Sequence, residues 1–127
     1  FSGNGRMEQP ISKLISESNP IFYVIECMPN MSPDMITSNT IPLVDTIRNK
    51  HPNTPIILVN LFTSPLTVLD NNANKETNEM NNALKTEYEK MISSGYDNII
   101  YLESSNALGN DFEGTVDAVH LKDILIF

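Results

Sequence analysis

The sequence predicts an α/β fold with a parallel sheet, because three short apolar runs alternate with segments that repeat apolar residues at helical spacing. The runs cover residues 21–27, 56–61 and 98–102 and are rich in β-branched and aromatic side chains. Each is almost continuously apolar, which is typical of parallel strands covered on both faces. Strand, helix and strand therefore follow one another as in a doubly wound sheet with right-handed crossovers.

Three helices are expected between and around these strands. The first covers residues 7–18, where Ile11, Leu14 and Ile15 share one face. The second covers residues 33–50, with Ser32 as N-cap and Pro33 in the first helical position. Its apolar positions are Ile36, Ile41, Leu43, Val44 and Ile47.

The third helix is expected over residues 74–94, and Gly95 suits the left-handed position just beyond its end. The Asn-rich stretch before it, residues 70–74, is expected to form a solvated loop and a helix cap. The apolar positions of this helix are Met80, Leu84, Tyr88, Met91 and Ile92.

Length and composition fit one modest domain, residues 1–127, because 40% of the residues are hydrophobic. A net charge of −8 argues against binding to nucleic acid, which depends on Lys and Arg. The chain has one cysteine and two histidines, so neither an internal disulfide nor a zinc cluster is expected, and no cofactor is expected either. No apolar run approaches the roughly 20 residues of a transmembrane helix. Compartment and oligomeric state stay open.

In open α/β sheets, ligands bind beyond the carboxyl ends of the strands. The polar segments that follow the three predicted strands are residues 28–30, 62–64 and 103–105. Asn30 in the first of them has a side-chain amide that can donate to an oxyanion, and the alternative is an ordinary turn residue. Candidate chemistry is therefore expected at this edge.

Both ends of the chain carry further candidates. Asp117 precedes His120 by three residues, so its carboxylate can orient a ring that acts as general base. The opening sequence Phe-Ser-Gly-Asn-Gly-Arg is a Gly-rich loop before a helix, and its backbone N–H groups can bind an oxyanion. His51 is explained more simply as a contact at a helix C-terminus.

These pieces together resemble the SGNH/GDSL hydrolase superfamily of serine esterases, through residues 1–8, 23–31 and 117–120. The resemblance implies a flavodoxin-like three-layer α/β/α fold. It also implies Gly3 as backbone oxyanion donor, Asn30 as side-chain oxyanion donor, His120 as general base and Asp117 as its orienting carboxylate. Two positions differ from the family pattern, since Pro29 stands where many relatives have Gly, and Leu121 stands where Pro is common.

The nucleophilic serine does not carry over, because the family places it in a block that precedes the first residue of this chain. The resemblance therefore implies that the first strand and this serine lie upstream, and both ends are expected to be cut. The substrates that the resemblance favours are carboxylic esters, such as acetyl groups on carbohydrates.

Three alternative hypotheses about the function of the chain stay open. Ser2 or Ser64 is a weak candidate for a nucleophile inside the chain, and the Cys27 thiol is a weaker one. The chain could instead be a non-catalytic binding module in which residues 2–5 form a nest for a phosphate-bearing ligand such as a flavin mononucleotide. It could also be an inactive esterase fragment.

Overall fold

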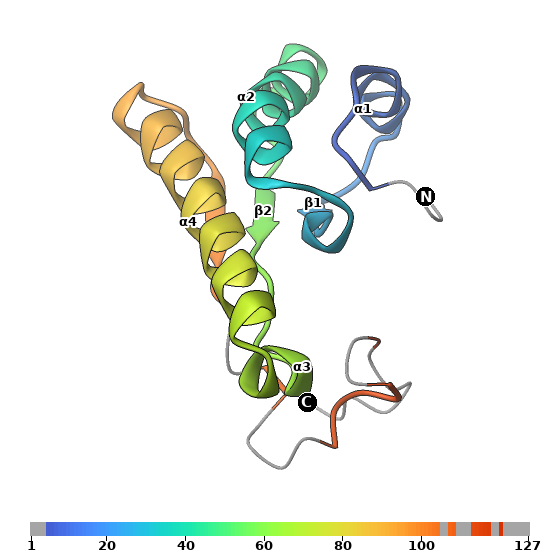
Figure 1. Ribbon diagram of the computed structural model, residues 1–127. Helices are drawn as coiled ribbons and strands as arrows, with labels where there is room; N and C mark the ends of the chain where they lie inside the picture. Colours follow the sequence, from blue (N-terminus) through green and yellow to red (C-terminus); the bar gives the residue numbers. More distant parts are fainter. Residues whose placement is uncertain (1–4, 105–106, 109–112, 118–119, 121–127) are drawn as a thin grey trace.

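The computed structural model describes residues 5–104, 107–108, 113–117 and 120 (Figure 1). The three strands of a parallel sheet lie side by side in chain order, with one helix before the first strand and helices between each strand and the next. This arrangement confirms the predicted α/β fold with a parallel sheet. The elements in chain order are α1 (Gln9–Ser16), β1 (Tyr23–Ile25), the 3-10 helix η1 (Met28–Asn30), α2 (Pro33–Lys50), β2 (Ile56–Val59), α3 (Pro65–Leu69), α4 (Asn71–Ser93) and β3 (Ile99–Leu102).

The sheet buries one face well. Ile56 and Leu58 of the central strand β2 are fully buried, and their neighbours in β1 and β3 follow the same alternation. In Figure 1, α2 and α4 lie over the sheet and α1 lies beside α2. On the opposite face, Val24, Ile100 and Leu102 are about half exposed. Within the described residues, the expected cover on both faces is therefore found on one face only.

Helix α2 has the predicted start and end. The Ser32 hydroxyl accepts a hydrogen bond from the Met35 N–H at 3.3 Å, so the predicted N-cap is confirmed. Four of the five predicted apolar positions are buried, namely Ile36, Leu43, Val44 and Ile47. This helix therefore supplies the largest share of the core between the sheet and the other helices.

Helix α1 is shorter than predicted, and its most buried residues are serines next to the predicted apolar positions. Leu14 is 51% exposed, whereas Ser12 and Ser16 are buried. Their hydroxyls donate to the Glu8 and Lys13 carbonyl oxygens at 3.0 and 2.7 Å, so the polar groups are satisfied within the helix and its lead-in. The predicted apolar face is thus correct for Ile15, which packs against the core, and wrong for Leu14, which is exposed.

The Asn-rich stretch is helical rather than a loop, which corrects the prediction for residues 71–74. Helix α4 begins at Asn71 because the Asp70 carboxylate accepts the Asn72 N–H at 2.8 Å. The side chains of Asn74 and Asn78, one turn apart, then bond at 3.1 Å. At the other end, Gly95 has φ of 86°, which confirms the predicted left-handed position.

Candidate active site

Asp117 and His120 form a hydrogen-bonded pair, as their spacing suggests. One carboxylate oxygen lies 2.7 Å from the His120 ring Nδ1, and the other accepts the His120 backbone N–H at 2.7 Å. Both oxygens thus hold the same residue. Because Nδ1 faces a carboxylate, its proton stays there and Nε2 is the nitrogen that can accept a hydroxyl proton. The His120 side chain is 77% exposed, so a reacting group can reach it.

The loop that carries this pair is shaped by a close contact. A Cβ placed on Gly114 would lie 2.9 Å from Cδ2 and 3.0 Å from Cβ of Leu108. Leu108 and Thr115 are both buried, and the Val116 N–H donates to the His120 carbonyl oxygen at 2.9 Å. A larger residue at position 114 would require the Leu108 side chain to move. In Figure 1 the loop lies toward the end of the sheet where α3 begins.

The 3-10 helix η1 places Asn30 directly after β1, beside the opening loop. A Cβ on Gly5 would lie 3.5 Å from the Asn30 side-chain nitrogen and 3.5 Å from Cα of Cys27. The structure therefore brings the predicted amide donor next to the described end of the Gly-rich loop. Gly3 and Ser2 lie outside the described residues, as do residues 118–119 and 121–127.

The opening loop is held by contacts to α2. The Arg6 carbonyl oxygen accepts from the Asn39 side-chain amide at 2.9 Å, and the Thr40 hydroxyl lies 3.5 Å from the Met7 sulfur. Met7 is buried and has φ of 55°, an uncommon conformation for a large side chain. Such strain persists only where surrounding contacts enforce it. The contacts of Arg6 and Met7 with α2 therefore fix the chain next to Gly5, which lies beside Asn30.

A second set of contacts joins the carboxyl ends of β2 and β3. The buried Asn60 side-chain oxygen accepts from the Ser104 N–H at 2.6 Å and from its hydroxyl at 2.9 Å. The Ser104 hydroxyl is also 2.6 Å from the Asn60 carbonyl oxygen. Ser104, one of the polar residues expected to follow a strand, thereby fixes the edge of the sheet on which the candidate residues lie.

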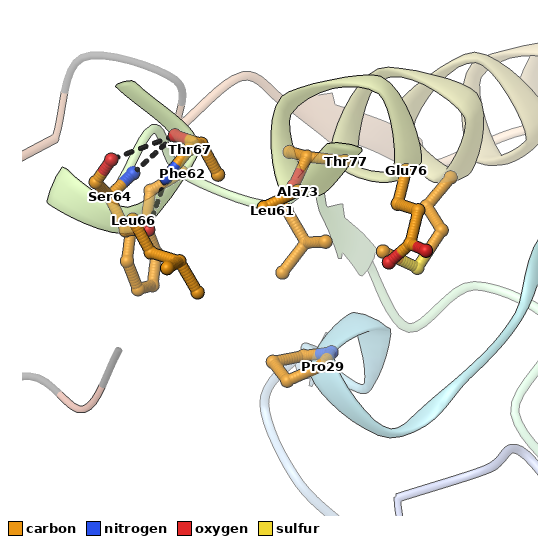
Figure 2. A pocket seen from close by; sticks show the side chains of 10 residues that line it. Pro29, Leu61, Phe62, Ser64, Leu66, Thr67, Ala73, Glu76 and Thr77 are labelled. Carbon is orange, nitrogen blue, oxygen red and sulfur yellow. Dashed lines mark hydrogen bonds between the residues drawn. The ribbon is translucent and has the colours of Figure 1, made fainter. Parts of the chain in front are cut away.

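A pocket of about 230 Å³ opens at this same edge. Figure 2 shows Pro29 opposite Leu61, with Phe62 and Leu66 on one side and Glu76 on the other. Sequence reasoning missed Leu66, because the five residues of α3 are too few to show a periodic pattern. The sequence does contain one signal for this helix, because Ser64 followed by Pro65 is a typical N-cap and first helical residue. The full lining is Pro29, Leu61, Phe62, Ser64, Leu66, Thr67, Ala73, Glu76, Thr77 and Met80.

The surroundings of Ser64 and Cys27, the other nucleophile candidates that the structure describes, do not activate them. Ser64 is the N-cap of α3 and forms a reciprocal capping box with Thr67. Burial and the neighbouring Glu26 raise the pKa of the Cys27 thiol, partly offset by a hydrogen bond with the Met7 backbone, whereas a thiol nucleophile needs a lowered pKa. His51 caps α2, and its Nε2 lies 2.9 Å from the Ser16 carbonyl oxygen at the end of α1.

The predicted phosphate nest lies mostly outside the described residues, since only Gly5 of residues 2–5 belongs to them. Across the part of the chain that the structure describes, no cluster of three or more His, Cys, Asp or Glu side chains could hold a metal ion. Among these same residues, no helix has the length and apolar character needed to cross a membrane.

Comparison with known proteins identifies a family and two structures that share the fold. The sequence profile of the GDSL-like Lipase/Acylhydrolase family matches residues 1–126. A structure described as a GDSL-like lipase from Bacteroides ovatus ATCC 8483 is 30% identical with a TM-score of 0.89, over 93% of this chain and 35% of that one. A salicylyl-acyltransferase from a tetracycline biosynthetic pathway is 17% identical with a TM-score of 0.76, over 92% of this chain and 37% of that one, and shows a shared fold. The chain thus spans about a third of each structure, and no curated protein matches it.

Proposed function

Because the chain belongs to the GDSL-like lipase/acylhydrolase family, we propose that it forms part of a serine esterase whose base is His120 and whose orienting carboxylate is Asp117. The observation that carries this proposal is the pair of 2.7 Å contacts from the two Asp117 oxygens to the His120 ring and backbone. A histidine held this way has a defined tautomer and ring orientation, as hydroxyl activation requires.

The proposed reaction is acyl transfer through a covalent intermediate. A serine hydroxyl attacks the ester carbonyl carbon while His120 Nε2 takes its proton, and the same imidazolium then protonates the departing alkoxide. Water attacks the acyl-serine with His120 again as base, which releases the carboxylic acid and restores the serine. Asn30 and Gly3 donate to the oxyanion in both steps, and the exposed Asn30 beside Gly5 supports this part.

We further propose that the serine comes from residues outside this 127-residue segment. Ser64 is committed to capping α3, which supports its exclusion as a nucleophile. Carboxylic esters are the proposed substrates, with acetyl esters of carbohydrates included among them.

The test is ester hydrolysis by the natural gene product that contains residues 1–127. With p-nitrophenyl acetate, His120→Ala and Asp117→Asn are expected to lower kcat by about 10³-fold or more, and Asn30→Ala by about 10²-fold. His51→Ala is the matched control, because this second histidine bonds the Ser16 carbonyl oxygen and packs against Tyr23, away from the proposed pair. Equal kcat for the His120→Ala and His51→Ala variants would refute the proposal.

The 127-residue chain alone tests the position of the serine. If the serine lies outside it, the chain and its His120→Ala variant hydrolyse p-nitrophenyl acetate at the same background rate. Turnover that disappears only in the variant would place a nucleophile within the segment.

A further inference from the structure

We propose that Leu108 is a positioning residue for the proposed base, because it holds the turn that carries Asp117 and His120 against the anchored end of β3. This inference rests on the proposed esterase function and adds a residue to it. Leu108 is only 9% exposed, whereas Ala107 before it is exposed. Its side chain lies against Gly114, which precedes Asp117 by three residues.

The chain that leads to Leu108 is fixed to the sheet. The Ser104 N–H and hydroxyl both donate to the side-chain oxygen of Asn60, at 2.6 and 2.9 Å. Asn60 is buried directly after β2, so water competes little for these bonds. The Ala107 N–H then donates to the Ser104 carbonyl oxygen at 2.9 Å. Leu108 therefore follows a turn that is bonded to the carboxyl edge of the sheet.

The contact between Leu108 and Gly114 connects this fixed edge to the proposed base. A Cβ on Gly114 would lie 2.9 Å from Cδ2 and 3.3 Å from Cγ of Leu108, so the two residues are in close contact. Thr115, the next residue, is buried. Two residues later, Asp117 bonds both the ring and the backbone N–H of His120. Leu108 thus contacts the start of the turn whose other end is the base.

Asp117 and His120 orient each other, but their mutual bonds do not fix their place in the molecule. The two side chains are 51% and 77% exposed. Because their bonds join residues only three positions apart, the whole turn can shift without breaking them. A general base must lie within hydrogen-bond reach of the hydroxyl, and a misplacement of about 1 Å can cost about 10²-fold in rate. The packing of Leu108 against Gly114 opposes such a shift.

The experiment measures how fast the serine reacts with diethyl p-nitrophenyl phosphate in the natural gene product that contains this chain. The serine oxygen bonds to phosphorus, p-nitrophenolate leaves with the electron pair of its P–O bond, and the base takes the serine proton. The amount of p-nitrophenolate released counts the protein that can react, whereas the rate constant reports the placement of the base. Circular dichroism verifies that each variant is folded.

The variants separate positioning from general destabilisation. Leu108→Ala is expected to lower the rate constant by about 10²-fold without changing the amount released, because the turn is no longer held in place. Leu108→Met has a similar volume and should restore most of the rate constant. Leu84→Ala is the matched control at a fully buried leucine of α4 and should keep the wild-type rate constant. If Leu108→Ala is not folded, Leu108→Val makes the same comparison with a smaller cavity.

A double variant tests whether Leu108 acts through Gly114. Leu108→Ala and Gly114→Ala disrupt the same contact, so their effects on the rate constant should not multiply when the two changes are combined. Effects that multiply would overturn the positioning role, as would a loss that Leu108→Met does not restore.

The His120→Ala variant distinguishes failure of this proposal from failure of the esterase function. If it abolishes the reaction while Leu108→Ala and Leu84→Ala have equal rate constants, the positioning role is refuted and the esterase function stands. If His120→Ala reacts as fast as the wild type, both proposals are refuted.

Discussion

Arg48, near the end of α2, is the side chain whose removal should destabilise the fold most clearly. Its Nη1 donates to the His51 and Thr54 carbonyl oxygens at 3.1 and 2.5 Å, and its Nη2 donates to those of Asp97 and Asn98 at 2.9 and 3.0 Å. One guanidinium thus joins the C-terminus of α2 to the segments that lead into β2 and β3. No other side chain type offers several donors in such a rigid fork.

The magnitude follows from the burial of these bonds. The two bonds from Nη1 are half-buried and contribute about 1.5 kcal/mol each, whereas the two exposed ones add little, so Arg48→Met should cost about 3 kcal/mol of unfolding free energy. With an m-value of about 2 kcal/mol per M, the urea midpoint falls by about 1.5 M. Arg48→Lys should lose about half as much, because one ammonium reaches only some of the four oxygens.

The assay is urea unfolding followed by circular dichroism at 222 nm. Lys50→Met is the control in the same helical turn, since Lys50 makes only an exposed ion pair with Glu17 at 3.8 Å, which is worth about 0 to 1 kcal/mol. If Arg48→Met and Lys50→Met shift the midpoint equally, the four carbonyl contacts do not stabilise the fold as argued.

Three more predictions concern the site and its support. Gly114→Ala should lower esterase kcat by about 10²-fold, because its Cβ meets Leu108 and displaces the loop of the proposed base; wild-type kcat would contradict this. Asn60→Ala should cost about 2 kcal/mol in urea unfolding, because it leaves the Ser104 N–H without its acceptor, whereas Ser104→Ala keeps that bond and should cost less. Burial raises the pKa of Glu26 above its ordinary 4.5, so its ionisation destabilises the fold as pH rises through and above that value. Glu26→Gln should therefore raise the thermal midpoint at pH 7 but not below pH 4.5, and an equal gain at both pH values would argue against this cause.

The parts of the fold that could be predicted are those whose signals are local and strong. The start of α2 follows from Ser32 and Pro33, and the strands from short apolar runs of β-branched residues. The pairing of Asp117 with His120 was likewise expected from their spacing, although the second contact to the backbone N–H was not. Asn30 near Gly5 follows from the rule that strand ends and loops meet at one edge of the sheet.

The remaining features depend on tertiary contacts that a single sequence does not display. The most buried residues of α1 are serines, whose hydroxyls bond to nearby backbone carbonyls, so an apolar pattern could not show how far the buried side of this helix extends. Asparagines at the start of α4 have low helix propensity, yet the Asp70 cap overrides it. The pocket lined by Pro29, Leu61 and Leu66 depends on the short helix α3, which only the Ser64–Pro65 pair signals in the sequence.

The position of the core determines which parts of the molecule open most easily. The large apolar side chains with less than 2% exposure all lie between Met28 and Met91 in the described residues. The backbone that carries these side chains is the best-protected part of the described fold, so it should exchange its amide hydrogens most slowly. The loop with Asp117 and His120 lies outside it. Local opening of that loop would therefore abolish the proposed activity while the rest of the domain stays folded. Activity should accordingly be lost under milder conditions than the fold.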